Sequence, residues 1–222
     1  MSPPLDPSVL TPFQVEVGRL FFAQPESEGF FLAGAAGLVA QQLTARPTHD
    51  LDLFTSVCGP PVPAARDAFE VAARERGWTV HRIRDSEQFC RLAVSTAGST
   101  VIVDLAVDSP AGRPPTATVV GPTLAADDLV GRKVAALFSR AEARDFVDVF
   151  TLAGSYDRPR LLALAAEQDA GFETGVFAQM LRSLGRFTDA ELPCAPELTK
   201  QVRSFFAGWA EELGEASPTL GR

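Results

Sequence analysis

The chain has 222 residues, of which 46% are hydrophobic and 22% charged, and its formal net charge is -8 at pH 7. The length allows a sizeable core in one or two domains. The negative charge argues against broad nucleic-acid binding by charge alone, because that affinity comes mainly from Lys and Arg neutralising phosphates, so any RNA contact would need a local basic face. The longest apolar run, residues 30–40, is well short of the ~20 residues that a membrane span requires.

The N-terminal segment predicts a helix and no secretory leader. Residues 1–12 lack a basic start followed by an apolar core, so we expect no signal peptide. Thr11 and Gln14 have the spacing of a capping box, and Pro12 suits the first helical position. Apolar residues then recur on one face, which predicts a helix to about Gln24.

A turn of small residues follows the next apolar run. Residues 30–33 predict a short strand, and residues 38–43 have helical spacing. The turn between them, residues 34–37, should lie at a helix N-terminus, where unpaired backbone N–H groups and the positive end of the helix dipole can bind a phosphate. Small side chains keep that approach open.

Residues 50–54, with the sequence DLDLF, alternate polar and apolar side chains and predict a strand. The helix before it should stop ahead of Arg46, since a residue preceding proline avoids the α region. At a period of two, Asp50 and Asp52 project from one face, and their charges repel unless something neutralises them. In phosphoryl-transfer sites a pair of divalent cations does so, and Mg²⁺ is the natural candidate. The alternative is a solvated polar face.

The chain then predicts a helix over residues 64–76, stopped by Gly77, and three strands over residues 78–84, 89–95 and 100–108.

Asp104 interrupts the apolar, β-branched run of the last of these strands. A carboxylate there is costly unless it is paired or bound to a metal. If this strand lies beside residues 50–54, about 4.8 Å away, Asp104 completes a cluster of three carboxylates with Asp50 and Asp52. The alternative is an aspartate that faces water near a strand end, and Asp108 fits that description better.

Residues 109–122 are rich in Pro, Gly and Thr and mark a boundary between an α/β domain with an N-terminal helix, residues 1–122, and a helical domain, residues 123–222. Further amphipathic helices are expected over residues 161–168, 172–184 and 196–213.

The longest helical pattern covers residues 124–153. If it is one helix, Lys133, Arg140 and Arg144 fall within a narrow sector. Such a stripe is usually a solvated face. The chain uses lysine only at Lys133 and Lys200, however, which suggests a place where a compact point charge meets a triphosphate.

The cysteines predict no special chemistry. Cys58, Cys90 and Cys194 are far apart and have no ligand spacing with His49 or His81, so neither a zinc site nor a disulfide framework is indicated. A reducing cytoplasm fits this pattern.

Five segments carry the polar and small-residue motifs of the chain, in this order: residues 34–36, 46–54, 103–105, 133–140 and 144–148. Their R-x-T-x-D-x-D, K-x-x-A-L-x-x-R and R-D-x-x-D elements are fairly specific in combination. With them the chain resembles the nucleotidyltransferase AbiEii/AbiGii toxin family, members of the polymerase-beta-like nucleotidyltransferase superfamily.

The resemblance implies a fold and an activity. The fold would be α/β (α+β), a mixed sheet with flanking helices followed by a C-terminal helical domain. The activity would be transfer of a nucleoside monophosphate from a triphosphate, with Mg²⁺, to an acceptor hydroxyl of RNA or protein. Relatives are the toxin half of toxin–antitoxin pairs, which implies a cognate antitoxin protein, and some modify tRNA ends.

The resemblance also implies roles for the matched residues. Asp50 and Asp52 would hold the metals, and Asp104 would bind metal or orient the attacking hydroxyl. Lys133 would contact the triphosphate, and Asp145 would have a supporting or catalytic role. The other positions expected to contact the nucleotide are Gly34, Ala35, Ala36, Arg46, Thr48, Arg140 and Arg144.

The first motif departs from the family pattern. It usually has the sequence Gly-Gly-Ser or Gly-Gly-Thr, whereas Gly34, Ala35 and Ala36 carry no hydroxyl. A hydrogen bond to a charged group contributes about 1.5 to 3 kcal/mol, so triphosphate binding would be roughly ten- to a hundredfold weaker. Two alternatives therefore stay open: a non-catalytic nucleotide-binding or interaction module on the same fold, and a small-molecule adenylyltransferase of the antibiotic-modifying kind, whose cationic substrates suit a negative protein.

Overall fold

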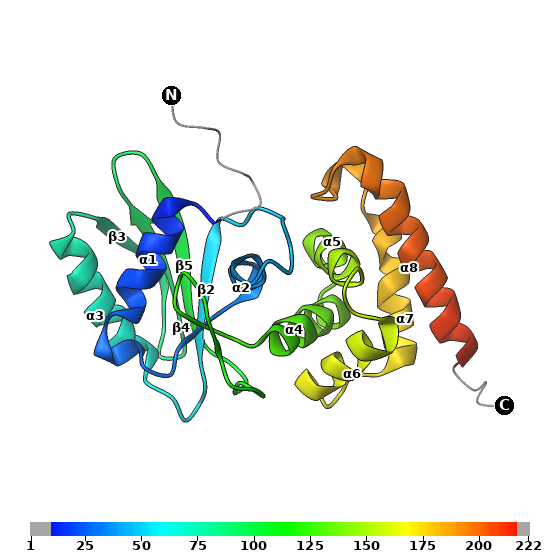
Figure 1. Ribbon diagram of the computed structural model, residues 1–222, viewed down its shortest axis with the longest axis horizontal. Coiled ribbons are helices and arrows are strands. Elements are labelled where there is room, and N and C mark those ends of the chain that lie inside the picture. Colours follow the sequence, from blue (N-terminus) through cyan, green and yellow to red (C-terminus); the bar gives the residue numbers. More distant parts are fainter. Residues whose placement is uncertain (1–9, 217–222) are drawn as a thin grey trace. The chain divides into compact units, whose positions relative to one another are not determined.

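The computed structural model of the chain describes residues 10–216. A seven-stranded mixed sheet with flanking helices is followed by a helical segment (Figure 1), so the predicted fold class is confirmed. The chain divides into two compact units, Met1–Leu129 and Val130–Arg222. The domain boundary between residues 122 and 123 stays a prediction. The predicted absence of a secretory signal concerns residues 1–12, most of which lie outside the described residues.

The first unit contains the sheet. Its elements in chain order are α1 (Pro12–Phe22), the 3-10 helix η1 (Pro25–Ser27), β1 (Phe31–Ala33), α2 (Gly34–Ala40), β2 (Asp50–Thr55), α3 (Val62–Glu75), β3 (Thr79–Asp85), β4 (Phe89–Ser95), β5 (Thr100–Val107), β6 (Thr116–Ala117), β7 (Pro122–Thr123) and the start of α4 (Ala126–Ser139). The strand order across the sheet is β3-β4-β5-β2-β1-β7-β6. The pairs β2·β5 and β1·β7 are parallel, and the other neighbours are antiparallel.

The predicted capping box starts α1. The backbone N–H of Gln14 donates to the Thr11 hydroxyl at 3.1 Å, and the Gln14 side chain accepts from the Thr11 N–H at 2.8 Å. The helix ends at Phe22, before the expected Gln24. The Gln14 amide also donates to the carbonyl oxygen of Thr48 at 2.9 Å. Helix α1 is thus fastened to the segment that leads into β2.

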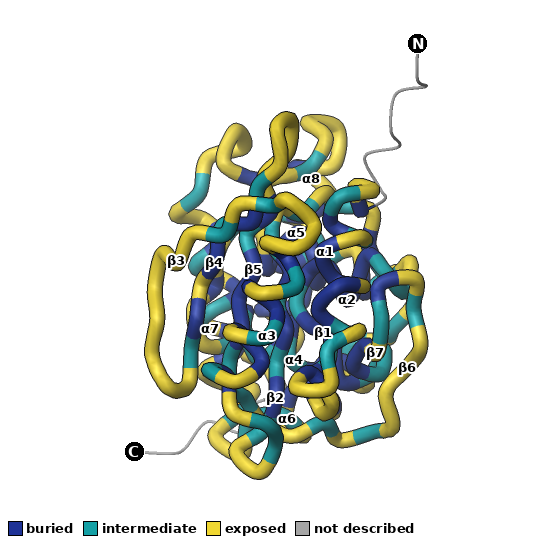
Figure 2. The backbone as a smooth tube through the Cα atoms, turned by 90° about the vertical axis from the view of Figure 1, so that its left-hand side faces the viewer, coloured by how far each residue is buried: buried dark blue, intermediate teal, exposed yellow. Residues whose placement is uncertain are grey.

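One face of the sheet packs against α1 and α3. Alternate strand residues form this core together with aromatic residues of the two helices: Leu32, Leu51, Leu53, Cys90, Leu92, Val103, Leu105, Phe21 and Phe69. Strand β2 alternates buried and half-buried positions along its whole length, as its sequence predicts. In Figure 2 the edge strand β3 is largely exposed, beside β4 and β5, which contain the buried positions.

The second unit is helical in its described part. It contains the rest of α4, α5 (Ala143–Leu152), α6 (Arg158–Gln168), α7 (Thr174–Arg182), the 3-10 helices η2 (Ser183–Arg186) and η3 (Asp189–Glu191), and α8 (Pro196–Ala216). Aromatic side chains pack edge to face in its core: the ring centroids of Phe146 and Phe206 are 5.1 Å apart, and those of Phe177 and Trp209 are 5.3 Å apart. Among residues 10–216, none of the helices has the length and apolarity to span a membrane.

The prediction of one helix over residues 124–153 is wrong. Helix α4 stops at Ser139, Ala141 adopts a left-handed conformation with φ 48°, and Glu142 caps a new helix, α5, through a capping box with Asp145. Lys133, Arg140 and Arg144 therefore do not lie on one helix. The break follows from local competition, because a side chain that accepts from the backbone offers the chain an alternative to continuing the helix.

We expect Leu53→Ala to lower the free energy of unfolding by about 2 to 5 kcal/mol, because it opens a cavity at a fully buried position of the central strand. Urea unfolding followed by circular dichroism measures this. The matched control is Val71→Ala on α3, where Val71 is 54% exposed. This substitution should change stability by no more than about 0.5 kcal/mol. Equal effects would contradict the described core.

Candidate active site

The strand register places three predicted carboxylates on one face of the sheet. Parallel pairing of β2 with β5 sets Asp52 opposite Asp104, so the predicted adjacency of these strands is confirmed. Asp50 lies two residues before Asp52 and therefore on the same face. This face is opposite to the one that carries the core residues Leu51 and Leu53. The roles of the three carboxylates stay predictions.

Gly34 fits tightly against one of these carboxylates. It has a positive φ of 58°, and a Cβ at this position would lie 1.7 Å from Oδ2 of Asp52. Only glycine satisfies both the left-handed backbone and the close approach. The small-residue turn is accordingly not a separate loop: Gly34 opens α2 directly after β1, and α2 ends at Ala40 rather than at the expected residue 43.

Ala35 and Ala36 form the first turn of α2, and both are buried. Ala36 has no exposed surface and belongs to the hydrophobic core. Ala36, at the position where the resemblance leads us to expect a hydroxyl, contributes a methyl group to the packing, and Ala35 stands where a glycine is expected.

Thr48 orients the first carboxylate. Its hydroxyl donates to Oδ1 of Asp50 at 2.5 Å, and its carbonyl oxygen is held by Gln14. Arg46, two residues earlier, donates from Nη1 to the carbonyl oxygen of Pro47 at 3.1 Å. Thr48 and Arg46 are both predicted nucleotide contacts. In the structure the hydroxyl of Thr48 binds the carboxylate of Asp50.

Arg91, a residue that the sequence analysis did not select, binds the third carboxylate. Its Nε donates to Oδ1 of Asp104 at 2.7 Å and its Nη2 to Oδ2 at 2.6 Å. Asp104 is 5% exposed. The hydrogen bonds and charge of Asp104 raise the pKa of Arg91, and the charges of Asp50 and Asp52 add to this effect, so the guanidinium stays protonated.

A signal for Arg91 was present in the sequence. The predicted strands over residues 89–95 and 100–108 are separated by a short connection, and a hairpin turn fixes the register of both strands. In the structure Ser95 pairs with Thr100, and counting outwards from that pair brings Arg91 opposite Asp104.

The second unit has an ion cluster of its own. Nζ of Lys133 lies 3.0 Å from Oδ2 of Asp148 and 3.3 Å from Oδ1 of Asp145. Asp145 also accepts from Nε of Arg140 at 2.9 Å and from its Nη2 at 3.1 Å. Both aspartates have no exposed surface and Lys133 is 8% exposed. Burial alone would raise the pKa of Asp145, but the Arg140 hydrogen bonds and the Lys133 charge outweigh it and lower that pKa.

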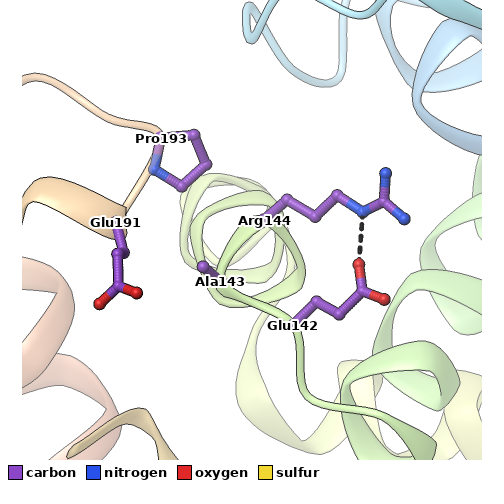
Figure 3. Close-up of a pocket in the computed structure, with 5 residues that line it drawn as sticks. All are labelled: Glu142, Ala143, Arg144, Glu191 and Pro193. Atoms are coloured by element: carbon purple, nitrogen blue, oxygen red, sulfur yellow. Dashed lines mark ion pairs between the residues drawn. The ribbon is translucent and has the colours of Figure 1, made fainter. Parts of the chain in front are cut away.

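Arg144 is not part of this cluster. Its Nε pairs with Oε2 of Glu142 at 2.9 Å, as Figure 3 shows, at the edge of a shallow pocket that Ala143, Glu191 and Pro193 also line. The structure thus brings Lys133, Arg140 and Asp145 together, and Arg144 is connected to them through Glu142, whose Oε1 lies 3.9 Å from Nε of Arg140.

The residues of the sheet face fit a metal in part. Carboxylate oxygens suit Mg²⁺, which commonly takes one or two of them together with substrate phosphates. Asp50 and Asp52 offer such a pair. Among residues 10–216, however, no three His, Cys, Asp or Glu side chains converge as metal ligands, and Asp104 is bound by Arg91.

The first unit thus combines a mixed sheet, acidic side chains aligned on one of its faces and a glycine at a helix start. The match to a family model assigns this combination to the nucleotidyltransferase class. The family model described as "Nucleotidyl transferase AbiEii toxin, Type IV TA system" matches residues 19–215. The chain belongs to this family, and the predicted resemblance is confirmed.

Solved structures show the same fold. The protein JHP933 from Helicobacter pylori is similar with a TM-score of 0.59 and 16% identity, over 95% of this chain and 97% of the other. A putative nucleotidyltransferase from H. pylori has a TM-score of 0.58 and 17% identity, over 96% and 100%. The nucleotidyltransferase toxin MenT4 from Mycobacterium tuberculosis, at 14% identity over 94% of each chain, has a TM-score of 0.48, which is too low to support an argument. No protein with a curated description matches the sequence.

Gly34→Ala should lower the free energy of unfolding by at least about 2 kcal/mol more than Gly77→Ala does. Both glycines have a positive φ, which strains alanine by about 1 to 2 kcal/mol, but a Cβ meets Asp52 at position 34 and nothing within 4 Å at position 77. Urea unfolding compares the two variants. Equal losses would mean that Asp52 does not press against Gly34.

Asp145→Asn should be less stable than the natural chain at pH 7 by roughly 3 kcal/mol, because buried ion pairs are broken. The pKa of Asp145 is lowered in the folded state, so its contribution is present above the unfolded value of about 3.9 and is lost as the pH falls through the folded value. The difference between the two proteins should therefore shrink below about pH 4.

Urea unfolding at a series of pH values measures this difference. The control is Asp189→Asn, whose carboxylate pairs with Arg203 but is 63% exposed. It should change stability by less than about 1 kcal/mol at any pH. A difference for Asp145→Asn that is constant from pH 7 to about pH 2 would contradict the lowered pKa.

Proposed function

We propose that the protein is a metal-dependent nucleotidyltransferase that moves a nucleoside monophosphate from a triphosphate to an acceptor hydroxyl of RNA or protein, and that it acts as the toxin of a toxin–antitoxin pair. The observation that carries this proposal is the alignment of Asp50, Asp52 and Asp104 on one sheet face, with Gly34 against Asp52. Membership of the toxin family supports it. A cognate antitoxin is the expected protein partner.

Asp50 and Asp52 are the proposed ligands of Mg²⁺, which when bound would stabilise the negative charge on the oxygens of the α-phosphate and of the leaving pyrophosphate. Thr48 fixes the carboxylate of Asp50, and Gly34 allows that of Asp52 to approach the first turn of α2. The acceptor oxygen would form a bond to the α-phosphorus in line with the leaving pyrophosphate, and the hydroxyl proton would be released. The side chains contribute mostly by positioning and by charge stabilisation.

Lys133 is the proposed contact of the triphosphate, with Arg140 beside it. Lys133 is paired with Asp145 and Asp148, so a phosphate that takes this lysine must compete with two buried carboxylates. Asp145 in this scheme is a positioning residue, because it holds both cations.

A non-catalytic module is the second candidate, and one observation favours it. Ala36 is fully buried in the core, so this position supplies a methyl group to the packing and no hydroxyl to a phosphate. This candidate retains nucleotide binding and predicts no transfer.

The test is incubation with each α-labelled nucleoside triphosphate and Mg²⁺, together with total tRNA, a protein extract or small-molecule pools. We expect label in RNA or protein, and a loss of at least about a hundredfold in Asp52→Asn, comparable with the loss of a preorganised electrostatic group. Asp67→Asn, a carboxylate on α3 with 58% exposure, should retain the activity. Label in none of the pools would leave the non-catalytic module, and label in small molecules alone would indicate an antibiotic-type enzyme.

A further inference from the structure

The alignment of three carboxylates creates a charge problem that two metals would ordinarily solve. Asp52 and Asp104 are direct partners on neighbouring parallel strands, and like charges in such positions destabilise a sheet. In a two-metal site, cations about 3.5 to 4 Å apart share the carboxylates. A third carboxylate is then a ligand of the second ion.

In this chain a guanidinium already satisfies the third carboxylate. Arg91 donates to both oxygens of Asp104, at 2.7 and 2.6 Å, from two different nitrogens. Parallel charge-assisted bonds of this kind are among the strongest that a carboxylate accepts. Asp104 is 5% exposed, so it needs a partner of opposite charge that stays in place.

A second divalent cation at Asp104 would have to tolerate Arg91 or displace it. If the cation bound beside Arg91, the guanidinium and the divalent ion would together place three positive charges around one carboxylate. Displacement would break two short hydrogen bonds between Arg91 and a buried carboxylate. The hydrogen bonds of Arg91 go to Asp104 and do not extend to Asp50 or Asp52.

We propose that Arg91 takes the place of the second divalent cation, so that the site works with one metal held by Asp50 and Asp52, while Asp104 serves to position Arg91. This inference rests on the proposed nucleotidyltransferase function and deepens it. Arg91 is a positioning residue for the third carboxylate and a fixed positive charge next to the other two. Its third nitrogen, Nη1, makes no hydrogen bond within the described residues and offers donors to a phosphate or acceptor oxygen.

The charge of Arg91 and that of one divalent cation together equal the charge of the three carboxylates Asp50, Asp52 and Asp104. The arrangement also explains why the structure contains no convergence of three ligands within residues 10–216. The third acidic residue, Asp104, binds the guanidinium of Arg91 instead of a metal ion.

The test counts bound ions instead of activity. Mn²⁺ is titrated into the whole protein with the α,β-methylene analogue of each ribonucleoside triphosphate, and the free ion is measured by electron paramagnetic resonance. We expect one Mn²⁺ per chain. Asp104→Asn should leave the number and affinity unchanged within about twofold, whereas Asp52→Asn should weaken binding at least about tenfold because it loses a direct ligand.

Two bound ions in the natural protein, or the loss of one in Asp104→Asn, would overturn the proposal while leaving the nucleotidyltransferase function intact. If neither Mn²⁺ nor any analogue binds, the inference and the proposed function fail together. The two failures are therefore distinguishable.

Arg91→Gln provides the converse test, since it frees Asp104. In protein with the native circular dichroism spectrum we expect the count to rise from one Mn²⁺ to two. The matched control is Arg84→Gln, which removes a charge from the residue that pairs with Arg91 across β3 and β4 but frees no carboxylate; its count should stay at one. A count of one in folded Arg91→Gln would show that Arg91 is not what excludes the second ion.

Discussion

The parallel pairing of β2 with β5 is the constraint on which the site depends. It sets Asp52 against Asp104 in a sheet whose other face is committed to the hydrophobic core. A shift of one residue would turn every acidic side chain into that core, so the core fixes the register and the register fixes the site. Because the register is fixed, Asp50, Asp52 and Asp104 cannot move apart to reduce the repulsion between their charges. The remaining features of the face, the hydroxyl of Thr48, the bare Cα of Gly34 and the guanidinium of Arg91, each accommodate one carboxylate.

The second unit handles its buried charges differently. Asp145 and Asp148 have no exposed surface, and both are satisfied by Lys133, with Arg140 as a further donor to Asp145. In the sheet, three acidic side chains share one face and Arg91 binds one of them, whereas in the helices Lys133 and Arg140 pair with the buried aspartates. A carboxylate in a sequence motif can therefore serve either chemistry or the fixing of a cation. Only its partners distinguish the two.

Several elements of the fold and of the candidate site could be predicted because they depend on local sequence patterns. The alternation in residues 50–54, the capping box at Thr11 and the apolar run around Asp104 each depend on neighbours in sequence, and the structure agrees with them. The break at Ala141 could not be predicted from periodicity, because apolar spacing continues across it and a glutamate is a rare cap. Arg91 was missed because its partner, Asp104, lies on the neighbouring strand β5. Side-chain pairing across strands needs a register, which a motif search does not supply.

The fastening of Gln14 to Thr48 has a practical meaning for work with this protein. A line of hydrogen bonds runs from the backbone of Thr11 through Gln14 and Thr48 to the carboxylate of Asp50. The first residues of the described chain are thus mechanically joined to an acidic side chain of the site. Loss of the Gln14 side chain would therefore remove the hydrogen bond that holds Thr48, the residue whose hydroxyl orients Asp50.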